Sequence, residues 1–262
     1  MSRETALPPP KEIFYEDEDI LIETCLFDTP SVVFSFSSFI REGEPYKAFG
    51  YPFLPREGFS AVYFTAKVGH WWQMRNMPDL VSAVEDRCAA YADRVTYGSS
   101  MGGYGALHFA SPLGAQRAIA VVPQVHIADP HLSRRPEWDE ELAKRQIFFD
   151  DISASLGSAP VELKLLYDPR FARDMYSARL LASFYPVQNY LAPFMGHRLL
   201  AALKEAGLLE RVITGMLSGR LEPDEFRTMI RKVRSGDERY DRVLKRGLAQ
   251  RRKRSETQLP RG

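Results

Sequence analysis

A short run of small residues around Ser100 has the composition and spacing of a site that could do chemistry. It reads Gly98-Ser99-Ser100-Met101-Gly102-Gly103. A serine can attack a carbonyl only when its Oγ is exposed, lies near a base and sits beside donors for the developing oxyanion. The pattern G-x-S-x-G meets these needs in a sharp strand-to-helix turn, where glycine lets neighbouring backbone approach closely. The spacing therefore predicts Ser100 as a nucleophile.

The segments on either side of this run have the patterns that such a turn requires. Residues 94–97 predict a strand, and residues 101 to about 109 predict a helix. The backbone N–H of Met101, at the start of that helix, would be one oxyanion donor, helped by the helix dipole. His108 lies eight residues beyond Ser100 on the same helix, about 12 Å along its axis, so it cannot be the base.

This strand, glycine-flanked serine and helix resemble the α/β-hydrolase family, and the resemblance covers roughly residues 12–200. In that family an acid and then a histidine follow the nucleophile along the chain. A predicted strand over 161–167 ends at Asp168, and His197 follows another predicted strand over 187–191. The resemblance implies that His197 takes the proton of Ser100 and that Asp168 fixes the imidazole tautomer.

Asp174 is the alternative acid. It lies 23 residues before His197 and directly precedes a predicted helix, so we interpret it as a helix N-cap and favour Asp168.

The second oxyanion donor is less well defined. In the family it comes from the loop after an early strand, often with a His-Gly pair. Here Ser37-Ser38-Phe39 follow the predicted strand over 31–36 instead. We expect a backbone N–H near Ser37 to serve.

Three further residues are candidates for a substrate pocket: His70, Trp71 and Tyr104. Indole rings bury a large area and still offer an N–H, so Trp71 suits a pocket wall, and core packing is the alternative for it and for Tyr104. A phosphate-binding P-loop would need Lys-Ser or Lys-Thr after its last glycine, and Tyr104 stands there. The sequence implies no metal and no organic cofactor.

The elements needed to position these residues can be predicted from hydrophobic patterns. Short apolar runs at 13–15 and 20–22 favour an antiparallel edge pair. Further strands are expected at 31–36, 60–64, 94–97, 118–122, 161–167 and 187–191, with helices at 78–92, 101–109 and 178–184. Alternating strands and helices predict an α/β fold with an open, mostly parallel, twisted sheet and helices on both faces.

Three regions depart from this alternation. Residues 125–158, which include His126 and His131, are expected to form a cap-like insertion in a core spanning residues 1–200. Residues 201–250 predict a helical extension packed on the core, with helices at 199–208, 209–217, 223–234 and 239–252. Residues 251–262 predict a disordered basic tail.

The overall composition excludes few partners. The chain has 262 residues and a formal charge of +1, so its net charge does not favour nucleic acid. Residues 198–262 carry 17 basic and 9 acidic side chains, mostly a solvated face by our interpretation. Cys25 and Cys88 lack metal-ligand or disulfide spacing, and neither a signal segment nor a membrane span is evident, so we expect a cytoplasmic protein. The oligomeric state stays open.

Together these features predict a serine hydrolase that cleaves a carboxylic ester, with a small-molecule or carbohydrate ester as its substrate. The resemblance to the family implies an O-acyl carbohydrate as one such ester. Two alternatives use the same fold. An acyltransferase would pass the acyl group from the same triad to an alcohol, and a non-catalytic binding module would keep the pocket without the reaction. Fold alone carries little information about substrate.

Overall fold

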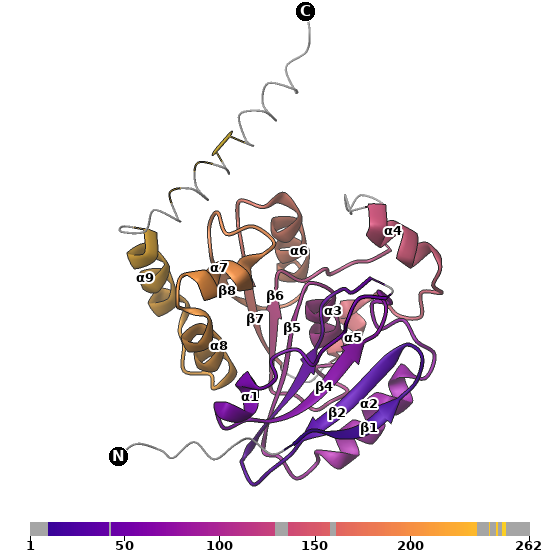
Figure 1. The fold of residues 1–262 in the computed structure, drawn as a ribbon. Coiled ribbons are helices and arrows are strands. Elements are labelled where there is room, and N and C mark those ends of the chain that lie inside the picture. The colour runs from indigo at the N-terminus through magenta and orange to yellow at the C-terminus, as the bar shows by residue number, and fades with distance from the viewer. Residues whose placement is uncertain are drawn as a thin grey trace, which may run out of the picture.

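The computed structural model describes residues 10–41, 43–128, 136–157 and 161–234, and residues 241, 245, 248 and 249. In this part of the chain eight strands form one twisted sheet (Figure 1). They are β1 (Glu12–Glu16), β2 (Ile20–Cys25), β3 (Ser31–Phe36), β4 (Ser60–Ala66), β5 (Asp93–Ser99), β6 (Arg117–Val121), β7 (Glu162–Tyr167) and β8 (Val187–Leu191). The predicted strands are all present, with ends shifted by a few residues.

The strand order is β1-β2-β4-β3-β5-β6-β7-β8. The pairs β1–β2 and β2–β4 are antiparallel, and every other neighbouring pair is parallel. The acidic turn between β1 and β2 is closed by Asp17, whose Oδ1 accepts from the backbone N–H groups of Asp19 and Ile20, both at 2.9 Å. The predicted fold class, an open and mostly parallel sheet with an antiparallel edge pair, is confirmed.

Helices cover both faces of the sheet (Figure 1). Thr96 Oγ1 on β5 donates to the carbonyl of Ala106 on one covering helix at 2.7 Å. Arg117 on β6 pairs in register with Val95, whose side chain faces away from that of Thr96, and it reaches the carbonyl of Leu217 at 3.0 Å. The helices of Ala106 and Leu217 therefore lie on opposite faces, as predicted.

The helices are α1 (Phe53–Arg56), α2 (Met77–Arg87), α3 (Met101–His108), α4 (Pro136–Ala143), α5 (Ile152–Leu156), α6 (Ala172–Ala182), α7 (Leu199–Glu205), α8 (Leu209–Leu217) and α9 (Pro223–Arg234). Helix α6 begins six residues earlier than predicted, so Asp174 lies in its first turn and not before it. Helices α4 and α5 belong to the segment inserted between β6 and β7. His131 and the predicted tail over 251–262 lie outside the described residues.

Of the helices predicted after His197, α8 and α9 have the predicted bounds, and α7 ends three residues early at Glu205. The helix predicted over 239–252 lies mostly outside the described residues. Helix α9 packs on β8, where the rings of Phe226 and Tyr190 have centroids 5.7 Å apart. The hydroxyl of Tyr190 donates to the carbonyl of Leu221 at 2.6 Å. Within the described residues, no helix combines the length and apolar character needed to cross a membrane. No disulfide joins the two buried cysteines, Cys25 and Cys88.

Helix α3 packs so closely on the sheet that it requires glycine at several positions. A Cβ added to Gly102 would lie 2.2 Å from the carbonyl oxygen of Phe36 and 2.8 Å from that of Ser37. A Cβ added to Gly105 would lie 2.5 Å from Nε1 of Trp72. Because backbone atoms cannot move aside as a side chain can, Gly102 fixes how near α3 lies to the end of β3.

We predict that Gly102→Ala destabilises the fold by at least about 1–3 kcal/mol, because the new methyl group must displace the β3 backbone. Urea unfolding followed by circular dichroism measures this change. Ser99→Ala is the matched control in the same turn, since it removes an atom, and it should stay within about 0.5 kcal/mol of the parent. Equal stability of the Gly102 variant and the parent would contradict the packing described here.

Candidate active site

Ser100 occupies the turn between β5 and α3 in a strained backbone conformation. Its φ is 56° and its ψ is −117°, a region that residues other than glycine rarely adopt. Its N–H donates to the carbonyl of Val121 on β6 at 2.9 Å. A Cβ added to Gly98 would lie 2.0 Å from the carbonyl oxygen of Gly102, so glycine two residues before the serine allows the turn to close. Strain of this kind is typical of functional sites.

His197 joins Ser100 to a carboxylate. Its Nε2 lies 3.0 Å from Oγ of Ser100, and its Nδ1 lies 3.0 Å from Oδ1 of Asp174. The imidazole comes from the loop after β8, and the serine comes from the turn after β5. Ser100 and Asp174 precede His197 by 97 and 23 residues in the sequence, and the fold brings all three into one hydrogen-bonded chain. This is the arrangement that activates a serine hydroxyl.

The carboxylate that contacts His197 is that of Asp174 and not that of Asp168, which the sequence analysis favoured. The predicted N-cap role of Asp174 is also wrong, because α6 is preceded by Phe171 as its N-cap and Asp174 lies in the first turn. Its side chain therefore points from the helix toward the imidazole of His197. Asp174 lies seven residues after Tyr167, the last residue of β7, and no local sequence signal placed the start of α6 at Ala172.

Asp168 instead holds the surrounding loops in place. Its Oδ2 accepts from the N–H of Gly196 at 2.7 Å, and its Oδ1 accepts from the N–H of Arg170 at 2.8 Å. Gly196 has a φ of 64°, which favours glycine, and directly precedes His197. Asp168 is thus bound to the backbone beside the histidine.

Asp174 is almost completely buried, with 2% of its surface exposed. Burial raises the pKa of this carboxyl, and the hydrogen bond and charge of His197 oppose that rise. Its Oδ2 is buried without a hydrogen-bond partner among the described residues. A carboxylate desolvated to this degree interacts strongly with a proton held by His197.

Met101 starts α3, where the first N–H groups have no partner within the helix. Its carbonyl accepts from Nε1 of Trp72 at 2.9 Å, and its Sδ lies 3.4 Å from the N–H of Trp71. These contacts fix the residue whose N–H was predicted as an oxyanion donor. Trp71 and Trp72 both have positive φ, 46° and 62°, so this loop is strained as well.

Ser37 does not have a free N–H, which corrects the prediction for the second donor. Its N–H donates to the carbonyl of Phe64 at 3.0 Å, and its Oγ accepts from the N–H of Ala66 at 2.9 Å. Sheet-like pairing between β3 and β4 therefore continues through Ser37. The next residue, Ser38, lies beside the turn, because its Oγ donates to the carbonyl of Ser99 at 3.0 Å.

Two of the three predicted pocket residues, His70 and Tyr104, are buried in the core. His70 has no exposed surface, its Nδ1 accepts from the N–H of Trp72 at 2.8 Å, and its Nε2 lies 3.2 Å from the carbonyl of Asp19. Burial lowers the pKa of His70 to about 4, so it is a neutral core histidine. Tyr104 is buried too, and its hydroxyl donates to the carbonyl of Phe149 at 2.6 Å.

Trp71 is also fully buried, and an aromatic cluster connects it to His197. Its ring centroid is 6.3 Å from that of Trp138 on α4, and the Trp138 ring is 5.9 Å from that of His197. Phe171, the N-cap of α6, lies 5.9 Å from His197. Sequence reasoning missed Trp138 and Phe171 as neighbours of His197, since nothing in their local pattern indicates which loop they face.

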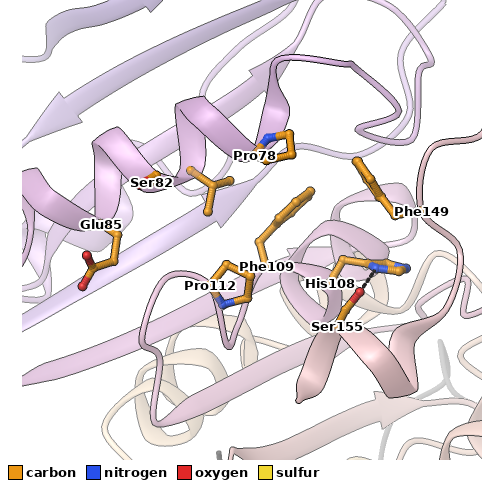
Figure 2. A pocket seen from close by; sticks show the side chains of 9 residues that line it. Pro78, Ser82, Glu85, His108, Phe109, Pro112, Phe149 and Ser155 are labelled. Atoms are coloured by element: carbon orange, nitrogen blue, oxygen red, sulfur yellow. Dashed lines mark hydrogen bonds between the residues drawn. The ribbon is translucent and has the colours of Figure 1, made fainter. Parts of the chain in front are cut away.

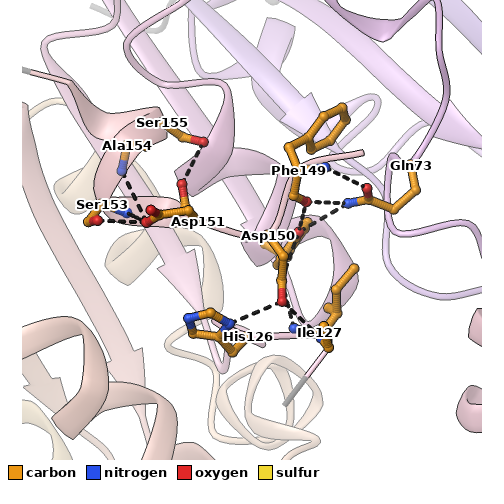
Figure 3. A network of polar contacts seen from close by, with 11 residues as sticks. Gln73, His126, Ile127, Phe149, Asp150, Asp151, Ser153, Ala154 and Ser155 are labelled. Atoms are coloured by element: carbon orange, nitrogen blue, oxygen red, sulfur yellow. Dashed lines mark hydrogen bonds and ion pairs between the residues drawn. The ribbon is translucent and has the colours of Figure 1, made fainter. Parts of the chain in front are cut away.

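The inserted segment is tied to the loop of the two tryptophans through Gln73 (Figure 3). Oε1 of Gln73 accepts from the N–H groups of Phe148 and Phe149 at 2.8 and 3.1 Å, and its Nε2 donates to the carbonyl of Phe149 at 2.8 Å. Asp150 follows and accepts from the N–H of Ile127 at 2.8 Å.

In the described residues no group of three or more histidine, cysteine or carboxylate side chains could hold a metal ion.

No protein-family model matches the sequence, and no curated protein does. Solved structures do match. The capsule O-acetyltransferase of Neisseria meningitidis serogroup A is 14% identical, with a TM-score of 0.58 over 81% of this chain and 97% of that one. The HSL homologue EstE7 from a metagenome library is 13% identical, with a TM-score of 0.56 over 82% and 87%.

The fluorophosphonate-binding serine hydrolase F of Staphylococcus aureus is 15% identical, with a TM-score of 0.52 over 79% of this chain and 99% of that one. At these identities the likeness concerns the fold. Together with the strand order and the turn at Ser100, it identifies the protein as a chain with the α/β-hydrolase fold.

Proposed function

We propose that the protein is a serine enzyme that acts on carboxylic esters through an acyl-enzyme formed on Ser100. One observation carries the proposal: His197 lies 3.0 Å from both Ser100 Oγ and Asp174 Oδ1, and Ser100 stands in a strained turn at the start of α3. Esterases and an acetyltransferase that share the fold support an ester as the substrate.

In the proposed reaction His197 accepts the hydroxyl proton as Ser100 Oγ attacks the ester carbonyl. The negative oxygen of the tetrahedral intermediate is stabilised by the N–H of Met101 and by a second N–H on the segment after β3, for which Ser38 is the nearest candidate. The C–O bond to the alcohol then breaks, and His197 gives its proton to the departing oxygen. Water repeats the attack on the acyl-enzyme and releases the carboxylic acid.

Asp174 serves as the acid of the triad in this proposal. Its carboxylate keeps the Nδ1 proton on His197 and stabilises the imidazolium after proton transfer. Asp168 is a positioning residue, because it holds the N–H of Gly196 next to His197.

The substrate that we propose is a small-molecule or carbohydrate ester, including an O-acyl carbohydrate. Similarity to a capsule O-acetyltransferase supports the carbohydrate.

We also propose that the insertion over residues 125–158 acts as a cap, because it brings Trp138 to 5.9 Å from His197. We also propose a cytoplasmic location, because the two cysteines of the sequence have no disulfide-framework spacing.

An acyltransferase is the second candidate, and the similarity to the O-acetyltransferase over 97% of that chain favours it. The same acyl-enzyme would then be attacked by an alcohol, and the acyl group would move from one oxygen to another. The difference lies in which nucleophile reaches the acyl-enzyme.

We predict that a fluorophosphonate probe labels the protein covalently at Ser100, because the probe reacts with an activated serine hydroxyl. Intact-mass spectrometry and peptide mapping locate the label. Ser100→Ala should abolish it, and Ser99→Ala, on the neighbouring residue, should retain it. Labelling that survives Ser100→Ala would remove Ser100 from the mechanism, and an unlabelled parent protein would favour a non-catalytic binding module.

We predict that Asp174→Asn lowers kcat for p-nitrophenyl acetate by about 10³–10⁴-fold, because an amide cannot hold the required tautomer of His197. Asp168→Asn is the matched control, and it should cost about tenfold or less, since one amide oxygen can still accept from Gly196. Release of p-nitrophenol measures both rates, and circular dichroism checks folding. The reverse ordering would return the acid role to Asp168.

The fate of the acyl group separates hydrolysis from transfer. With p-nitrophenyl acetate and methyl glucoside, a hydrolase releases acetate in equal amount to p-nitrophenol, whereas an acyltransferase yields acetylated glucoside in its place. Mass spectrometry of the products measures the ratio. We expect acetate to predominate, and a majority of acetylated glucoside would assign the protein to the transferase candidate.

A further inference from the structure

A strained bend after β6 places one polar side chain among buried apolar ones. Val122, the first residue after the strand, has a φ of 42°, which a β-branched residue rarely adopts. Its N–H donates to the carbonyl of Leu166 on β7 at 2.8 Å, so the sheet holds it in this conformation. Gln124 follows two residues later and is 7% exposed, and Val125 has no exposed surface. Backbone strain that the surrounding structure maintains is concentrated at functional sites.

The bend brings Gln124 beside the candidate active site. The carbonyl of Val121, three residues earlier, accepts from the N–H of Ser100 at 2.9 Å. A Cβ added to Gly103 would lie 2.9 Å from Cβ of Pro123, so the residue directly before Gln124 packs on the first turn of α3. Since three residues of chain span at most about 11 Å, Gln124 lies near both the serine and the start of the helix.

The indole of Trp71 determines which end of the Gln124 amide is free. Nε1 of Trp71 donates to Oε1 of Gln124. Because an indole N–H can only donate, the amide oxygen must face the indole and the amide nitrogen must point away from it. Trp71 also contacts Met101, whose Sδ lies 3.4 Å from the N–H of Trp71. Its ring lies 6.3 Å from that of Trp138, which is the neighbour of His197.

Nε2 of Gln124 carries two N–H donors and has no hydrogen-bond partner among the described residues. It is not one of the fully enclosed, unpaired atoms of this part of the chain, so some of its surface is open. Nε2 of His108 is the contrasting case. His108 lines a cavity between α2, the end of α3 and the inserted segment, but its Nε2 is enclosed (Figure 2). A bound molecule can therefore reach the nitrogen of Gln124 and not that of His108.

We infer that Gln124 is a substrate-binding residue, which donates from Nε2 to a hydroxyl or ring oxygen of a carbohydrate ester held at Ser100. The inference rests on the proposed function and names the part of the substrate that the amide recognises. The ester carbonyl is assigned to the N–H of Met101, and a simple acyl group has no other oxygen, so the acceptor belongs to the alcohol. A neutral amide favours an uncharged oxygen, because a carboxylate buried beside it would lack a cation.

Two matched acetates test this assignment on the full chain. Methyl 6-O-acetylglucoside has ring and hydroxyl oxygens, and cyclohexylmethyl acetate has a ring of the same size without them. The parent protein should have at least about fivefold higher kcat/KM for the glucoside, measured by acetate release. Equal rates for the two acetates, in a protein that hydrolyses p-nitrophenyl acetate, would overturn the inference and leave the proposed function standing. A parent inactive on p-nitrophenyl acetate as well would overturn both.

Gln124→Glu separates substrate binding from support of Trp71, because it keeps an acceptor for the indole and loses the N–H donors at about pH 8. It should lower kcat/KM for the glucoside at least about fivefold and leave cyclohexylmethyl and p-nitrophenyl acetate within about twofold. Gln124→Met, which is uncharged and has no donor, should give the same selective loss. Gln116→Glu, directly before β6 at its other end, is the matched control and should change none of these rates.

Two results with these variants would contradict the role of Gln124. Unaltered hydrolysis of the glucoside by Gln124→Glu would mean that the residue only supports Trp71. An equal loss with all three acetates in Gln124→Met would mean that it acts on the ester reaction itself and not on the alcohol part of the substrate.

Discussion

The close approach of the start of α3 to the ends of β3 and β5 is the constraint on which the candidate site depends. It forces Ser100 into a left-handed conformation with a φ of 56° and excludes any side chain at Gly98 and Gly102. The same geometry points the Ser100 side chain toward His197 and places the N–H of Met101 at a helix start. The proposed nucleophile and the proposed oxyanion donor are thus fixed together, because adjacent residues of one rigid turn supply both.

Much of this could be predicted from the sequence because the signals are local. Runs of β-branched and aromatic residues identified the strands, and the glycine spacing identified the turn at Ser100. His197 was found from its place after the last strand. Each of these inferences uses residues that are near one another in the chain, and the order of elements then limits the possible topology.

The remaining site residues depended on information that local patterns do not contain. Asp168 and Asp174 both follow β7, and only the start of α6 at Ala172 decides which one faces His197. Ser37 was misplaced because pairing with β4 extends one residue past the last strand position of β3. His70 and Tyr104 have polar groups that suit a pocket, yet both are buried, and each has a hydrogen-bond partner more than 40 residues away in the sequence.

The loop of residues 70–73 links the strained turn to the inserted segment. Trp72 donates to the carbonyl of Met101, and Gln73, the next residue, binds the backbone of Phe148 and Phe149. Left-handed backbone at a residue with a side chain costs about 1–2 kcal/mol, so the surrounding contacts must hold both tryptophans in place. A displacement of the insertion at Phe149 would therefore disturb Met101, the proposed oxyanion donor, because one short and buried loop contacts both.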